Sequence, residues 1–233
     1  MYSDATKPTV TSFTTDKANG AYNSGENITI TANTSELVLK DSTITVTLDT
    51  SETVTLTAAS NGTTLTGVYT VGSLNSPDLN VSSFALVDGS GDATAVVDKF
   101  GNTLSDTSAP TGANSLAGSA AIVIDNIPIV GSTPITSYTD VDTSTGWTAG
   151  DEVALIFSET VANKTDIATQ ILATTSLGTA GAGLAVAWTN SDKTATITTG
   201  SDMTIAVDGT IPLTGIEDAA GNTNDITFTL DLT

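Results

Sequence analysis

Apolar and polar residues alternate along several short stretches of the chain, the pattern of a β-strand with one buried and one exposed face. In the first half it covers residues 28–32, 44–48 and 54–58, where threonine fills most polar positions. The second half repeats it at 153–157, 184–188, 194–198 and 226–230. Turn-forming pairs such as Asn61-Gly62 and Asp88-Gly89 separate the stretches. Only 164–172 has a helical pattern, so the sequence predicts an all-β protein with one short helix.

An internal repeat defines the domain organisation. The segment at 98–102 (DKFGN) aligns with 218–222 (DAAGN), 87–89 (VDG) with 207–209 (VDG), and Pro8 with Pro128, each displaced by 120 residues. Three separated motifs with one offset indicate two homologous domains, which we place at 1–125 and 126–233. Domain 1 has an additional loop at 105–119 before its last predicted strand, 120–124.

The strand density favours one architecture for both domains. About seven strands in roughly 110 residues, with a turn every 8–12 residues, is typical of an immunoglobulin-like (Ig-like) β-sandwich. The alternative is a β-solenoid, because runs of alternating threonine also occur in such folds. A 120-residue repeat is much too long for one solenoid coil, so we expect two tandem Ig-like β-sandwich domains.

Composition and charge exclude several functional classes. The 233 residues include 26 Asp and Glu but only 6 basic residues, all lysine, for a net charge of −20, and they lack His and Cys. Common catalytic triads, thiolate nucleophiles and ordinary zinc or haem sites need those absent side chains. So negative a chain binds neither nucleic acid phosphates nor anionic membranes. We therefore expect no enzyme, no nucleic-acid partner and no membrane insertion.

Threonine is the most informative single residue type. The chain contains 47 threonines, whereas aromatic residues make up 5% of it. Threonine suits a half-exposed strand surface, and the scarcity of aromatics predicts an aliphatic core. This composition favours an extracellular protein, and after Met1 the sequence lacks the apolar run of a signal peptide.

Two motifs of the second domain resemble a known group of modules. Residues 153–159 (VALIFSE) and 215–222 (GIEDAAGN) are similar to the bacterial Ig-like modules of S-layer proteins and giant repetitive surface adhesins. The first domain departs from the pattern, since 33–36 (NTSE) lacks the phenylalanine and 98–102 has Lys-Phe in place of a small pair. The resemblance implies a tandem structural module on a bacterial or archaeal cell surface, often stiffened by calcium, with neighbouring Ig-like domains of the same chain as partners.

Ig-like topology predicts where acidic and amide side chains gather. The start of each domain, the end of its second strand and its last turn meet at one end of the sandwich. In domain 2 this end collects Asp125, Asn126, Glu159, Asp218 and Asn222, and in domain 1 it collects Asp4, Glu36, Asp98 and Asn102. Oxygen ligands in irregular geometry suit Ca²⁺ better than Mg²⁺. We therefore expect structural Ca²⁺, above all at the interdomain junction.

Simpler interpretations stay open at this point. The Asp-x-x-Gly-Asn motif is also an ordinary turn, and Glu36 and Glu159 could be solvated charges at strand ends. A second functional hypothesis is a binding module that grips a surface glycan or protein through Trp147, Trp188 or the loop at 105–119. Trp188 lies in an alternating strand, which favours a place in the core.

Overall fold

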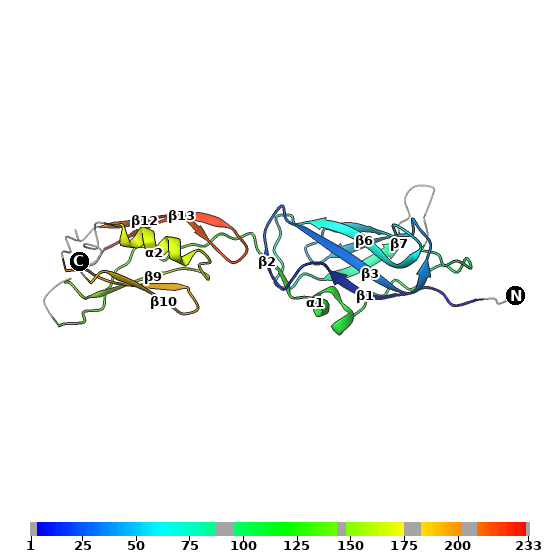
Figure 1. Ribbon diagram of the computed structural model, residues 1–233, viewed down its shortest axis with the longest axis horizontal. Coiled ribbons are helices and arrows are strands. Elements are labelled where there is room, and N and C mark those ends of the chain that lie inside the picture. Colours follow the sequence, from blue (N-terminus) through cyan, green and yellow to red (C-terminus); the bar gives the residue numbers. More distant parts are fainter. Residues whose placement is uncertain (1–3, 87–95, 144–147, 175–182, 202–208, 232–233) are drawn as a thin grey trace. The chain divides into compact units, whose positions relative to one another are not determined.

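The computed structural model of the protein describes residues 4–86, 96–143, 148–174, 183–201 and 209–231. The chain forms two compact units, Met1–Asn126 and Ile127–Thr233, each with its own hydrophobic core (Figure 1). Their boundary lies one residue after the one that the repeat suggests. Within the described ranges, no helix has the length and apolar character needed to cross a membrane.

Strands dominate the first unit. They are β1 (Val10–Thr15), β2 (Gly20–Tyr22), β3 (Asn27–Val38), β4 (Thr43–Leu48), β5 (Thr53–Thr57), β6 (Gly62–Thr70), β7 (Val81–Leu86) and β8 (Ile122–Ile124). Six of them pair in the order β1-β3-β6-β5-β4-β7, and all these pairs are antiparallel. The short strands β2 and β8 pair in parallel.

Alternation decides which face of this sheet is buried. Ile28 and Ile30 of β3 are fully buried, as are Ile44 and Val46 of β4. The intervening threonines face away from the core, and on β4 and β5 they stand directly opposite one another, as in the pair Thr45 and Thr55. β-Branched side chains pack well on such a pleated surface, so the threonine content and the strand content have one cause.

The additional loop of the first unit contains structure that the sequence pattern did not reveal. A 3₁₀ turn, η1 (Gly112–Asn114), leads into a single helical turn, α1 (Leu116–Ser119). The Ser115 hydroxyl accepts a hydrogen bond from the Gly118 amide and caps this turn, and Leu116 is fully buried in the core. One apolar residue in a Ser- and Gly-rich stretch therefore anchors the loop.

Within its described residues, the second unit has five strands and one helix. They are β9 (Glu152–Ile156), α2 (Lys164–Leu172), β10 (Ala185–Thr189), β11 (Thr194–Thr198), β12 (Thr210–Glu217) and β13 (Thr223–Thr229). The strands form two antiparallel sheets, β10-β11-β9 and β12-β13. Helix α2 coincides with the predicted helix, and its buried Ile167 and Ile171 pack into the core.

Aromatic side chains contribute to the core of the second unit more than its composition suggests. Phe157 packs edge-on against Phe228, with 5.4 Å between ring centroids, and stacks on the half-buried Trp188 at 5.8 Å. Gly131 leaves room for this group, because a Cβ there would lie 2.5 Å from the Phe228 ring. The remaining core residues are mainly Ile, Leu and Val, as expected. The predicted turn at Asp88-Gly89 and Trp147 lie outside the described residues.

Candidate metal site

The last turn of each unit is organised by one buried aspartate. In the first unit, Asp98 Oδ1 accepts the amides of Phe100 and Asn102, both at 2.8 Å, and Oδ2 accepts the Asn102 side-chain amide at 2.7 Å. Gly101 has φ +90°, a conformation that glycine adopts without steric cost. The turn interpretation of DKFGN is thus correct, and one lone pair of Oδ2 stays outside these bonds.

A bulge in strand β3 positions the glutamate. The pairing of β3 with β6 shifts register between Asn33 and Val38, so the strand kinks where Glu36 lies. Val38 then bridges to Asp98, and the Leu39 amide donates to the Val97 carbonyl at 2.8 Å. These contacts bring Glu36 next to the last turn, although 62 positions separate it from Asp98 in the chain.

The N-terminal segment supplies the third carboxylate. The Thr9 amide donates to the Ser35 hydroxyl at 3.0 Å, and the Ser35 amide donates to the Thr9 carbonyl at 2.9 Å. Farther back, the Asn102 side chain donates to the Asp4 carbonyl at 3.2 Å. Asn102 therefore holds both Asp98 and the backbone of Asp4.

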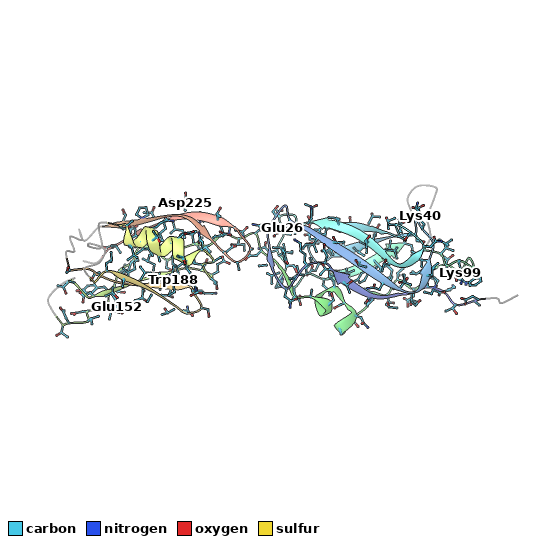
Figure 2. All side chains as sticks on the ribbon, viewed as in Figure 1. Glu26, Lys40, Lys99, Glu152, Trp188 and Asp225 are labelled. Carbon is cyan, nitrogen blue, oxygen red and sulfur yellow. The ribbon has the colours of Figure 1, made fainter. Side chains whose placement is uncertain are left out.

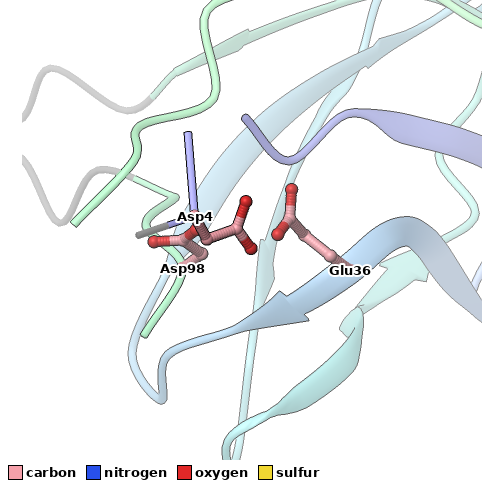
Figure 3. A group of neighbouring side chains, drawn as sticks. All are labelled: Asp4, Glu36 and Asp98. Atoms are coloured by element: carbon pink, nitrogen blue, oxygen red, sulfur yellow. The ribbon is translucent and has the colours of Figure 1, made fainter. Parts of the chain in front are cut away.

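These three carboxylates converge. One oxygen each of Asp4, Glu36 and Asp98 lie within 4.8 Å of one another (Figure 3). They border a cavity of about 190 Å³ that is also lined by Leu37, Lys99 and Phe100. Asp98 is 1% exposed, whereas Asp4 and Glu36 are half-buried. Such spacing fits a single cation between them, because Ca²⁺ lies 2.3–2.6 Å from each ligand oxygen.

Electrostatics at this cluster are unfavourable for Glu36. Desolvation, followed by the charges of Asp4 and Asp98, raises the pKa of the Glu36 carboxyl above its ordinary value. Desolvation acts on Asp98 in the same direction, but hydrogen bonds from Asn102, Phe100 and Gly101 outweigh it and lower the pKa of Asp98. Asp98 is thus held ionised by its turn, while Glu36 lacks comparable support.

One oxygen of Glu36 has no hydrogen-bond partner. Its Oε1 atom is buried. Among the described residues, it is the buried side-chain oxygen or nitrogen for which no hydrogen-bond partner is found. A buried acceptor without a donor is costly, because it loses water and gains nothing in return. Figure 3 shows the Glu36 carboxylate directed toward Asp4. The possible ligands are carboxylate oxygens, one of which lacks a hydrogen-bond partner, and such ligands fit a hard cation.

The second unit repeats this construction. Asp218 is 1% exposed, and its Oδ1 accepts the amides of Ala220 and Asn222 at 2.8 and 2.9 Å. Asn222 donates to Asp218 Oδ2 at 2.8 Å, and an oxygen of Glu159 lies within 4.8 Å of one of Asp218. The Val130 amide donates to Ser158 as Thr9 does to Ser35.

The two residues at the end of the first unit play different parts. Asn126 is bound within the first unit, where its Oδ1 accepts the Ser24 amide at 2.7 Å and its Nδ2 donates to the Gly72 carbonyl at 3.2 Å. The Asp125 amide donates to the Tyr22 carbonyl at 3.0 Å, which fixes its backbone. Asp125 lies three residues before Pro128, close to the place that Asp4 has four residues before Pro8.

A third acidic group in the second unit was not predicted. Oxygens of Asp140, Asp142 and Asp151 lie within 4.8 Å of one another, but only Asp151 is buried. Asp151 accepts the amides of Val141 at 3.0 Å and Thr148 at 2.7 Å, so its role in the loop is structural. The Asp-Val-Asp triplet at 140–142 was the available signal.

Among the residues considered for glycan binding, Trp188 is half-buried. Trp188 lines an open groove of about 360 Å³ together with Val186 and the α2 residues Lys164, Ala168 and Leu172.

Comparison with protein-family models, with curated proteins and with solved structures finds no match for this chain.

Proposed function

We propose that the chain is a non-enzymatic spacer segment of a long bacterial or archaeal extracellular surface protein, an adhesin or an S-layer protein. In this proposal both units are Ig-like sandwiches stabilised by structural Ca²⁺. The antiparallel sheets, the separate cores and the repeated turn support such a tandem arrangement. The sequence resemblance provides the cellular setting.

The observation that carries the calcium proposal is the unpartnered Oε1 atom of Glu36. A lone surface cluster of acids is common, but a buried carboxylate oxygen without any donor is costly, and a bound cation would offset that cost. Among the lysines for which the structure gives an ion pair, the partners are Glu26, Asp41 and Asp192, none of which belongs to this cluster. A cation from solution is therefore the natural occupant.

Oxygen chemistry favours Ca²⁺ over other cations. The cluster offers carboxylates without nitrogen or sulfur, and the cavity leaves room for water ligands. Ca²⁺ accepts six to eight oxygens in irregular geometry, whereas Mg²⁺ prefers a strict octahedron and retains its waters. Asn102 and Asn222 orient the aspartates through their side-chain amides, and in this proposal their amide oxygens are further ligands.

The proposal extends to the junction of the two units. Asp125 immediately precedes the last residue of the first unit, and Glu159 and Asp218 belong to the second. In this proposal, Asp125, Glu159 and Asp218 would coordinate one Ca²⁺ together, and the shared cation would limit bending. A spacer benefits, because a locked chain gains reach in proportion to its number of modules, whereas a flexible one gains only the square root.

Two measurements on the full chain test this function. Isothermal titration of chelator-treated protein with Ca²⁺ is expected to give saturable binding that Glu36→Gln reduces by one site, while the control Glu26→Gln retains all sites. Small-angle scattering is expected to show a larger maximum dimension in Ca²⁺ than in EDTA, and Asp218→Ala with Glu159→Ala is expected to abolish the difference. Equal binding by both glutamine variants, or equal dimensions in both buffers, contradicts the proposal.

The groove beside Trp188 favours one alternative, a glycan-binding module. Trp188 is half-buried and its ring is held by Phe157, which would give a sugar ring a rigid surface on which to stack. Titration with neutral oligosaccharides, followed by tryptophan fluorescence, tests this alternative. A saturable change in wild type that is absent in Trp188→Ala supports it.

A further inference from the structure

Lys99 and Phe100 distinguish the first acidic cluster from its counterpart in the second unit. They occupy the middle of the last turn, between Asp98 and Gly101, where the second unit has Ala219 and Ala220. Both side chains are exposed and both line the cavity beside Asp4 and Glu36. Ala220, by contrast, is 8% exposed. The repeat therefore provides an internal comparison in which the turn is kept and the two side chains change.

The Lys99 ammonium lies over an aromatic ring and not among the acids. Its Nζ atom is 4.8 Å from the centroid of Phe100, within the range of a cation–π interaction. Across the part of the chain that the structure describes, no carboxylate comes within ion-pair distance of Lys99. Lys99 thus lines the cavity of a cluster with a buried, unpartnered carboxylate oxygen without forming an ion pair to it.

We infer that Phe100 holds Lys99 away from the acidic cavity and that Lys99 is a built-in competitor of the cation, which sets the first site to a lower affinity. This inference rests on the proposed cation site. A cation–π contact at an exposed position and an exposed ion pair have similar strengths, so the ring can hold the ammonium even beside carboxylates. Phe100 thereby keeps the cavity open, and Lys99 weakens cation binding through its nearby positive charge.

The two side chains are then expected to act in opposite directions. Lys99→Ala removes a charge close to the bound cation and should tighten Ca²⁺ binding by roughly three- to tenfold. Phe100→Ala releases the ammonium toward the carboxylates and should weaken binding by roughly two- to fivefold. Once the lysine is absent, the ring has nothing to hold, so the double variant should bind like Lys99→Ala alone.

The experiment uses the full chain with Glu159→Gln, which silences the second cluster so that calorimetric titration with Ca²⁺ reports the first. Wild type, both single variants, the double variant and Lys40→Ala are compared in this background. Lys40 is a matched control, because it is a lysine of the same unit whose ammonium is 3.0 Å from Asp41. Figure 2 shows Lys40 and Lys99 at separate positions on the first unit.

The outcomes separate this inference from the function on which it rests. Tightening by Lys99→Ala but not by Lys40→Ala, with weakening by Phe100→Ala that disappears in the double variant, supports the competitor role. If Ca²⁺ binds but Lys99→Ala has no greater effect than Lys40→Ala, or if the Phe100→Ala effect persists without the lysine, the inference is wrong and the cation site stands. If no variant binds Ca²⁺, the cation proposal fails and the inference fails with it.

Discussion

Replacing Glu36 by glutamine should have opposite effects on stability with and without calcium. The substitution keeps the shape of the side chain, removes its charge and supplies an amide next to Asp4 and Asp98. In EDTA, Glu36→Gln should melt at or above the wild-type temperature, because the ionised carboxylate is desolvated and repelled there. In Ca²⁺ it should melt below wild type, because the cation has lost a ligand.

The size of the calcium effect follows from linkage. At 1 mM Ca²⁺ and a Kd of about 10⁻⁴ M, binding to the folded state alone adds about 1.4 kcal/mol per site. The entropy of unfolding for a unit the size of Met1–Asn126 is about 0.26 kcal/mol/K. The expected rise in Tm of the first unit is therefore roughly 5 °C in wild type and close to zero in Glu36→Gln.

Differential scanning calorimetry of the full chain measures this effect, and hydrogen exchange of β3 assigns the transition to the first unit. Glu26→Gln is the matched control, since it removes the same charge from the same unit at a site where the carboxylate accepts the Asn23 amide. Mg²⁺ at equal concentration controls for screening of the negative net charge. Equal gains from calcium in wild type and Glu36→Gln, or equal gains from Mg²⁺ and Ca²⁺ in wild type, would refute the reasoning.

Three further predictions concern the turns and the core. Asp218→Ala leaves the buried amides of the last turn without their acceptor and should destabilise the second unit by about 2–3 kcal/mol in EDTA. Urea unfolding followed by tryptophan fluorescence measures this loss, and a loss below about 0.5 kcal/mol contradicts the proposed role of the turn. In metal-free protein, the lowered pKa of Asp98 gives stability that is complete above pH 4 and is lost as the pH falls through its folded pKa. Asp98→Asn should therefore make the stability of the first unit depend less on pH in the acid range. An unchanged pH dependence in that range refutes this prediction. Gly131→Ala places a methyl group against Phe228 and should lower the free energy of unfolding by about 1–3 kcal/mol. The control Ala154→Gly, on the exposed face of β9, should lower it by about 1 kcal/mol or less. Equal losses of stability show that the close approach of Gly131 to Phe228 is unimportant.

Local pattern predicted some of the elements of this protein. Alternating residues predicted β3, β4, β5 and β11, and helical spacing predicted α2, because a strand or helix with one buried face shows its period directly in the sequence. The repeat motif likewise indicated the two DxxGN turns, since the aspartate, glycine and asparagine act within five consecutive residues. The short turn α1 escaped prediction, because a single buried Leu116 leaves no period to read.

The environment of each acidic side chain was decided by the tertiary structure. The sequence could group Asp4, Glu36 and Asp98 only through an assumed topology, and it could not tell which oxygen would be satisfied. The bulge in β3, the Ser35 contacts of the N-terminal segment and the bridge from Val38 to Asp98 determine that Glu36 Oε1 is buried without a donor. These contacts join positions far apart in the chain, and hydrogen-bond satisfaction and desolvation depend on that packing, which has no local periodic signal.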